Sequence, residues 1–151
     1  MSAYVRAGCA AVGITVTTFG GAAVPRDQSQ EAAAEAARIS VIEFAALHAA
    51  DGVLVVDVRP ATPFDAGHIP GAINVPLADI GDRASEIGRR AGARRIVTYC
   101  SCAAESSSAA AARELARRGV PNVSALAGGL DEWILKGGRT EKTIRLATRR
   151  W

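Results

Sequence analysis

The pattern of hydrophobic positions divides most of the chain into alternating strands and helices. Two continuous apolar runs, residues 53–58 and 96–99, have the pattern of strands that are buried on both faces of a parallel sheet. Shorter strands are expected within residues 67–76 and at 122–126. Because helical segments separate these strands, the sequence predicts a single α/β domain with a central parallel sheet and helices on both faces.

The helix signals lie between the strands. Ser40 and Glu43 form a capping box, in which the serine accepts a hydrogen bond from a first-turn N–H and the glutamate reaches back. This box predicts a helix over residues 41–50. A run of serines and the following Gly119 predict a helix from about residue 106 to 118. Further helical segments are expected at residues 77–90 and 130–136.

The N-terminal segment differs from the rest of the chain. Residues 7–24 carry no charged side chain and follow Arg6, which is the order of a secretory signal, although the stretch lacks leucine. An exported leader that is cleaved, a cytoplasmic extension and a retained membrane anchor are all open interpretations. Export to the periplasm is favoured over a cytoplasmic location, and a membrane contact is expected only if the segment is retained. The expected domains are residues 1–24 as a possible leader, 25–38 as a linker or solvated helix, 39–138 as the folded domain and 139–151 as a basic tail.

Length and composition narrow the function classes. A chain of 151 residues accommodates one compact domain. Aromatic residues make up 5%, which is few for a surface that stacks bases, and the net charge of +3 is carried by the C-terminal residues, so nucleic acid is not an expected partner. The three cysteines, Cys9, Cys100 and Cys102, are too few for a disulfide scaffold and point to chemistry instead.

The residues that follow the second apolar run have the arrangement of a reactive-cysteine site. Cys100 ends the strand and is followed by a loop of small and polar residues that enters a helix. The N–H groups of such a loop and the positive end of the helix dipole stabilise an anion. A thiol there is expected to have a pKa below about 8.5 and to react as the thiolate. A buried, unreactive Cys100 that completes the strand is the alternative interpretation. The candidate substrate-binding loop comprises Ser101, Cys102, Ala103, Ala104, Glu105 and Ser106.

Four further motifs follow one another along the chain. In order, they are Asp57-Val58-Arg59, Gly67-His68-Ile69-Pro70-Gly71-Ala72-Ile73-Asn74-Val75-Pro76, Tyr99-Cys100, and Gly128-Gly129 followed by Trp133. In these motifs the chain resembles the rhodanese-like family over about residues 39–138, and Tyr99-Cys100 falls where the family places its catalytic cysteine. The resemblance implies a single rhodanese-like domain.

The resemblance also implies sulfur transfer through a persulfide. The thiolate of Cys100 would attack the outer sulfur of a small anionic donor such as thiosulfate, and sulfite would leave. A thiol or cyanide would then take the sulfur from Cys100. The loop and the helix start would hold the donor and the persulfide. This chemistry requires no metal and no other cofactor.

The loop departs from the family's pattern. Many members carry a glycine in the middle of the loop and an arginine before the helix, whereas Ala103, Ala104 and Glu105 occupy this stretch here. A cation for donor anions is therefore missing, and Glu105 is expected to repel them. The loop is also longer than usual, which leaves Cys100 or Cys102 as the nucleophile. Cys100 is favoured because it directly ends the apolar strand, and the Cys-x-Cys loop with a glutamate resembles a subgroup of the family.

Asp57 and Arg59 are candidate supporting residues. They follow the other buried strand and are therefore expected at the same edge of the sheet as Cys100. Arg59 either supplies the cation that the loop lacks or forms an ion pair with Asp57 or Glu105 that fixes the loop. His68 is interpreted as organising its Pro/Gly-rich loop and not as a catalytic group.

Other functions are open at this point. A phosphatase or arsenate reductase needs an arginine that closes the loop, and the absence of this arginine counts against both. A catalytically weak or inactive rhodanese-like binding module would explain the departures in the loop. A redox module would use a disulfide between Cys100 and Cys102.

Overall fold

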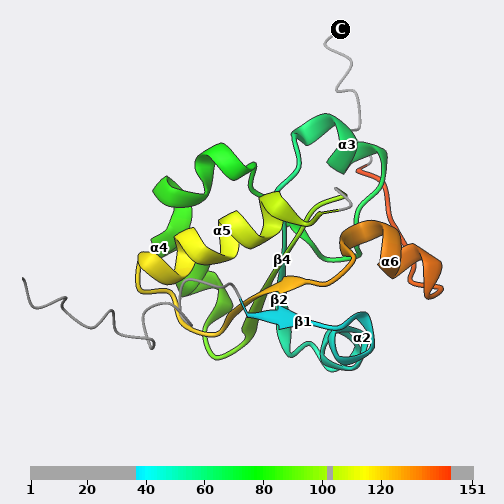
Figure 1. The fold of residues 1–151 in the computed structure, drawn as a ribbon, viewed down its shortest axis with the longest axis horizontal. Coiled ribbons are helices and arrows are strands. Elements are labelled where there is room, and N and C mark those ends of the chain that lie inside the picture. The colour runs from blue at the N-terminus through cyan, green and yellow to red at the C-terminus, as the bar shows by residue number, and fades with distance from the viewer. Residues whose placement is uncertain (1–36, 102–103, 144–151) are drawn as a thin grey trace, which may run out of the picture.

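The computed structural model describes residues 37–101 and 104–143, which form an α/β domain around a five-stranded parallel sheet (Figure 1). The strand order is β1-β5-β4-β2-β3, which confirms the predicted fold class. In chain order the elements are β1 (Arg38–Ile39), α2 (Val41–Ala49), β2 (Val53–Asp57), α3 (Ala61–Ala66), β3 (Ile73–Asn74), the 3-10 helix η1 (Leu77–Asp79), α4 (Ile80–Ala91), β4 (Arg95–Tyr99), α5 (Ser106–Arg117), β5 (Val123–Leu126) and α6 (Gly129–Leu135).

Helices cover both faces of the sheet. Every residue of β2 is buried, and successive side chains of the strand point to opposite faces. Leu54 and Val56 therefore belong to the hydrophobic cluster formed with α4 and α5, whereas Val53 and Val55 belong to the cluster formed with α2 and α6. Figure 1 shows these two pairs of helices on opposite sides of the strands.

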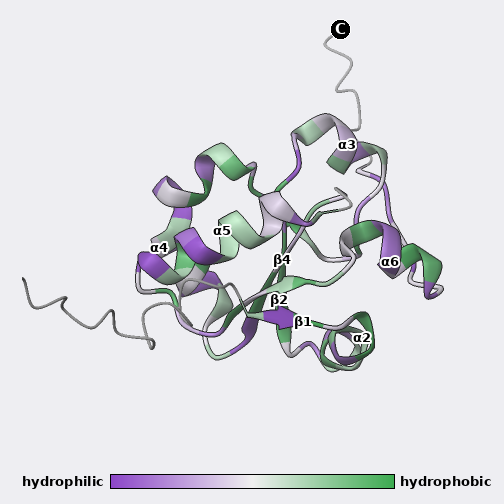
Figure 2. Ribbon diagram, in the orientation of Figure 1, coloured by the Kyte–Doolittle hydropathy of each residue, from purple (hydrophilic) through white to green (hydrophobic). Residues whose placement is uncertain are grey.

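Helix α4 illustrates how the sequence pattern produces the packing. Its buried residues are Ile80, Ala84, Ile87 and Ala91, a spacing that places them on one face of a helix. The remaining positions are mostly polar, and Figure 2 shows hydrophobic and hydrophilic stretches alternating along this helix. The apolar stripe packs on the sheet because its burial removes hydrophobic surface from water.

The predicted capping box forms only in part. The Ser40 Oγ accepts a hydrogen bond from the Glu43 N–H at 3.2 Å, as expected for the N-cap of α2. The Glu43 carboxylate instead forms an ion pair with Arg95 at 2.8 Å, at the amino end of β4. A long-range ion pair therefore takes the place of the local bond that the sequence pattern predicts.

Two elements were not predicted from the sequence. Strand β1 pairs with β5, with Arg38 opposite Ala125, so the sheet begins inside the segment assigned to a linker or solvated helix. A two-residue strand has no hydrophobic period that a sequence pattern could reveal. Helix α3 is the second element that the sequence analysis did not predict. It begins after Pro60 and contains no buried residue.

Residues 139–143, assigned from the sequence to a basic tail, run along the loop that contains His68. The backbone N–H groups of His68 and Glu141 each donate to the other's carbonyl oxygen at 2.9 Å. The indole N–H of Trp133 donates to the Arg139 carbonyl at 2.7 Å. This part of the predicted tail is therefore bonded to the domain.

The segments that flank the domain lie outside the described residues. They comprise residues 1–36, with the possible leader and most of the linker, and residues 144–151. Within the ranges that the structure describes, no helix is long and apolar enough to cross a lipid bilayer.

A chain that stops after Gly138 is expected to lose stability. It lacks the acceptor of the Trp133 indole and both backbone bonds to His68, and the loss of such bonds costs about 2 kcal/mol or more in total. A chain that stops after Thr143 keeps these bonds and is the matched control. Urea unfolding of both proteins measures the difference, and equal midpoints would show that residues 139–143 do not stabilise the domain.

Candidate functional site

The predicted site residues meet at the edge of the sheet where the parallel strands end. Asp57, the last residue of β2, pairs in register with Tyr99, the last residue of β4. Cys100 follows β4, and Gly128 lies just after β5. In parallel sheets this edge is where ligands bind, so the fold brings these segments to the expected place.

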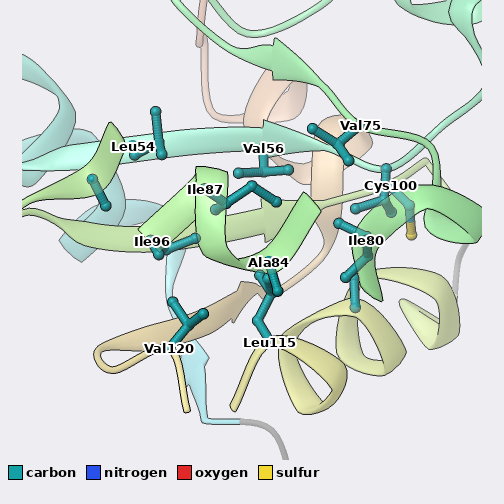
Figure 3. Packing of buried hydrophobic residues seen from close by; sticks show 13 residues of the cluster. Leu54, Val56, Val75, Ile80, Ala84, Ile87, Ile96, Cys100, Leu115 and Val120 are labelled. Atoms are coloured by element: carbon teal, nitrogen blue, oxygen red, sulfur yellow. The ribbon is translucent and has the colours of Figure 1, made fainter. Parts of the chain in front are cut away.

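Cys100 lies in the hydrophobic cluster on the α4 and α5 side of the sheet. Side chains alternate along β4, so Ile96 and Cys100 face this side, while Val97 and Tyr99 face the other. Cys100 is 3% exposed, and Figure 3 shows it at one end of the cluster. The thiol donates to the Ser108 Oγ across 3.7 Å. The sulfur therefore lies beside the first turns of α5.

Ser108 is a site residue that the sequence analysis did not identify. It is fully buried, and its hydroxyl donates to the Glu105 carbonyl oxygen at 3.0 Å. The Thr98 hydroxyl donates to the Ser108 carbonyl at 2.9 Å, which fixes this turn of α5 against β4. Residues 106–108 are all serines. Which of them faces the thiol depends on how α5 is rotated against β4, and the sequence does not show this rotation.

A close contact between backbones fixes the position of Cys100. The Leu130 N–H donates to the Cys100 carbonyl at 2.9 Å. Gly129 has a left-handed backbone with φ of +56°, and a Cβ at this position would overlap that same carbonyl oxygen. The Gly128-Gly129 motif therefore allows α6 to begin directly against the end of β4.

Arg59 forms an ion pair with Asp57, which is one of the two roles considered for it. Its Nη2 lies 2.6 Å from Asp57 Oδ2, and its Nε is 3.0 Å from both carboxylate oxygens. The guanidinium also donates to the Gly67 carbonyl at 2.7 Å and lies over the Tyr99 ring. Burial lowers the pKa of Arg59, but the hydrogen bond and the charge of Asp57 outweigh it and raise that pKa.

Tyr99 lies between these groups and the loop that contains His68. Its hydroxyl accepts a hydrogen bond from the Ile69 N–H at 3.1 Å. Burial, followed by the negative charge of Asp57, raises the pKa of Tyr99, so the phenol stays protonated while its oxygen accepts this bond. The phenol thereby links β4 to the loop that follows α3.

Glu105 lies where the candidate loop enters α5, and its carboxylate contacts Gly128 and Arg38. It is the N-cap of α5, with a left-handed backbone of φ +51°. One carboxylate oxygen accepts a hydrogen bond from the Gly128 N–H. The other, Oε2, lies 3.5 Å from Arg38 Nε and is an ion-pair partner without a hydrogen bond among the described residues. The sequence analysis did not identify Arg38, because it assigned this residue to the linker.

His68 has the organising role that the sequence suggested. The ring is 5% exposed and stacks on Phe64 with centroids 3.8 Å apart. Its Nδ1 lies 2.9 Å from the Phe64 carbonyl oxygen, and its Nε2 lies 3.3 Å from Glu141 Oε1. These contacts join α3 to residues 139–143.

The remaining predicted loop residues differ in how far they are described. Ser101, Ala104 and Ser106 are exposed beside the buried Cys100. Cys102 and Ala103 lie outside the described residues. Among residues 37–101 and 104–143, no group of three or more His, Cys, Asp and Glu side chains gathers to hold a metal.

Comparison with known proteins gives a match over most of the domain. Residues 40–136 match the family model described as Rhodanese-like domain. A stretch covering 56% of this chain is 42% identical to the HTH-type transcriptional regulator Rv0324 of Mycobacterium tuberculosis and covers 36% of that protein. Another stretch, 58% of this chain, is 36% identical to a protein from Allochromatium vinosum named sulfurtransferase and covers 77% of it.

A solved structure supports the same relationship. Thiosulfate sulfurtransferase from Pseudomonas aeruginosa matches with a TM-score of 0.64 and 26% identity, over 76% of this chain and 21% of that one. The chain covers between 36% and 59% of three of the curated relatives that it matches.

Gly129→Ala is expected to destabilise the domain by about 2–4 kcal/mol, because it adds a steric overlap to the strain of a positive φ. Gly71→Ala is the matched control. Gly71 has a φ of +74°, but a Cβ there meets nothing within 4 Å, so a loss of about 1 kcal/mol is expected from strain alone. Urea unfolding measures both, and equal losses would contradict a specific contact between Gly129 and Cys100.

Proposed function

Because the chain belongs to the rhodanese-like family, we propose that it is a sulfurtransferase that carries sulfane sulfur as a persulfide on Cys100. The observation that carries the proposal is the location of Cys100. It follows the central strand β4, and its sulfur faces the first turns of α5. The relative named sulfurtransferase supports this activity over a non-catalytic module.

The site gives reasons for Cys100 to react as a thiolate. The first N–H groups of α5 have no partner within the helix, and the helix dipole places partial positive charge at this end. Burial opposes ionisation because it removes the thiolate from water. We propose that Ser108 offsets part of this cost: its hydroxyl turns from the Glu105 carbonyl to donate to the charged sulfur.

In the first half of the proposed reaction, the Cys100 thiolate attacks the outer sulfur of the donor. A new S–S bond forms, the donor's own bond to that sulfur breaks, and the leaving group departs with the electron pair. With thiosulfate as donor, the leaving group is sulfite. In the second half, a thiol or cyanide attacks the outer sulfur of the Cys100 persulfide and regenerates the thiolate.

The other site residues support this chemistry without reacting. Asp57 and Arg59 hold the end of β2 and the loop at Gly67 in place. Glu105 fixes the start of α5 to the turn after β5. Backbone N–H groups near Ser101, Ala104 and Ser106 are the proposed donors to the sulfur anion.

Cys100→Ser is expected to abolish sulfur loading, because an alcohol at this position is neither ionised nor able to form a persulfide. The serine is nearly isosteric and leaves the fold intact. Mass spectrometry of the protein after treatment with thiosulfate or a small persulfide measures the gain of one sulfur atom that reductant removes.

Cys102→Ser is the comparison for this variant, although Cys102 lies outside the described residues. It is expected to alter turnover but to leave the sulfur on Cys100. Peptide mapping that found the sulfur on Cys102 would reverse the assignment. Absence of any loading in the native protein would contradict sulfur transfer itself.

Ser108→Ala is expected to raise the pKa of Cys100 by about one unit and to lower the rate of sulfur loading about tenfold, because the thiolate loses a hydrogen-bond donor. The neighbouring Ser107→Ala is the control and is expected to change neither. The rate of alkylation of Cys100 as a function of pH measures the pKa. An unchanged pH profile in Ser108→Ala, at unchanged stability, would remove Ser108 from the mechanism.

A further inference from the structure

We propose, resting on the sulfur transfer proposed above, that Arg38 is a positioning residue for Cys100 and acts through Glu105. Arg38 lies outside the candidate loop, on the edge strand β1. By pairing with the Glu105 carboxylate, it offsets a negative charge at the start of α5. Without this pairing, the charge would oppose formation of the Cys100 thiolate.

Glu105 brings a carboxylate close to the reactive cysteine. It is the N-cap of α5, and its carbonyl oxygen accepts a hydrogen bond from the Ser108 hydroxyl at 3.0 Å. The oxygen of that hydroxyl lies 3.7 Å from the Cys100 sulfur. The Glu105 carboxylate is bonded to the Gly128 N–H, and the following Gly129 packs against the Cys100 carbonyl. A negative charge held in this position raises the pKa of the neighbouring thiol, because it repels the thiolate.

One oxygen of the Glu105 carboxylate has Arg38 as its charged partner. Oε1 accepts from the Gly128 N–H, whereas Oε2 is buried and has no hydrogen bond among the described residues. Arg38 Nε lies 3.5 Å from Oε2, and this is the only ion pair of Glu105 within residues 37–101 and 104–143. The Glu105 side chain is 14% exposed, so water screens its charge only partly. The guanidinium of Arg38 therefore supplies the compensating charge.

The pairing of β1 with β5 directs Arg38 to the α5 side of the sheet. The next residue, Ile39, is fully buried in the cluster formed with α2 and α6. Because side chains alternate along a strand, Arg38 points to the opposite face, where it is in register with Ala125. Ala125 packs against Ala109 and Ala112 of α5. The two-residue strand β1 thus brings a cation to the helix whose first turns face the thiol.

Loss of the Arg38 charge is expected to act on Cys100 through Glu105. The carboxylate would keep its bond to Gly128 and stay beside the thiol, with its ion-pair partner removed. Repulsion between two unit charges about 10 Å apart in a protein raises a pKa by about one unit, and salt reduces the effect. A rise of this size lowers the thiolate fraction at neutral pH by up to about tenfold, and sulfur loading slows in proportion.

The exposure of Arg38 separates this role from a structural one. Its side chain is 56% exposed, and ion pairs of exposed side chains contribute little to stability. Arg38→Gln is therefore expected to fold with a urea midpoint close to that of the native protein. A slower reaction of Cys100 in this variant then reports the charge at the site and not a loss of structure.

The rate of alkylation of Cys100 as a function of pH tests the proposal in the full-length chain, with peptide mapping to assign the modified cysteine. In Arg38→Gln we expect the pKa of Cys100 to rise by about half a unit to one unit and sulfur loading by thiosulfate at neutral pH to fall about threefold to tenfold. Arg38→Lys keeps the charge and should restore most of the native profile. Arg95→Gln is the matched control, since it removes the arginine of the exposed pair with Glu43 at the opposite edge of the sheet and should change neither.

A second background tests whether Arg38 acts through Glu105. Glu105→Gln removes the negative charge, while the amide oxygen can still accept from the Gly128 N–H. In this background, Arg38→Gln should shift the pKa of Cys100 by less than half as much as it does in the native chain. Equal shifts in the two backgrounds would show that Arg38 acts on Cys100 directly and would overturn the proposal. An unchanged pH profile in Arg38→Gln, at unchanged stability, would also overturn it.

A failure of the proposed function gives a different result, because alkylation needs no sulfur donor. A native protein that gains no sulfur, while Arg38→Gln still shifts the alkylation profile, would contradict sulfur transfer and leave the role of Arg38 in the ionisation of Cys100 intact. A native protein that gains sulfur, with Arg38→Gln matching it in loading rate and alkylation profile, would contradict the role of Arg38 alone.

Discussion

The close approach between the end of β4 and the start of α6 is the constraint on which the site depends. Gly129 leaves room for the Cys100 carbonyl, and the Leu130 N–H binds it. With the backbone fixed, the alternation of side chains along β4 directs the sulfur to the α5 side of the sheet, where Ser108 lies. The sulfur is therefore positioned by the sheet and by the two helices α5 and α6.

The electrostatics of the site follow from the way its edge is held together. A buried carboxylate such as Asp57 requires a charged partner and further hydrogen bonds, and Arg59 supplies both. Glu105 fixes the start of α5 in the same manner through Gly128 and Arg38. Arg38 and Arg59, two groups that could otherwise bind an anion, are thus paired with carboxylates that stabilise this edge.

The sequence predicted the features that have a strong local or periodic signal. The buried runs of β2 and β4, the serine start and glycine end of α5, and the location of Cys100 beside that helix start all follow from pattern. Ser108 could not be singled out among three consecutive serines, because the phase of the helix relative to β4 depends on tertiary packing. Arg38 and residues 139–143, which the sequence analysis assigned to flanking segments, are bonded to the domain through short backbone pairings and a few side-chain bonds, and these leave no period in the sequence.

Burial of Cys100 bears directly on the reaction proposed for it. At 3% exposure the thiol has little contact with water, which opposes its ionisation. The dipole of α5 acts in the opposite direction, because its positive end lies beside the sulfur and stabilises a negative charge there. The Leu130 N–H and the space at Gly129 hold the Cys100 backbone, so the sulfur stays next to this helix start.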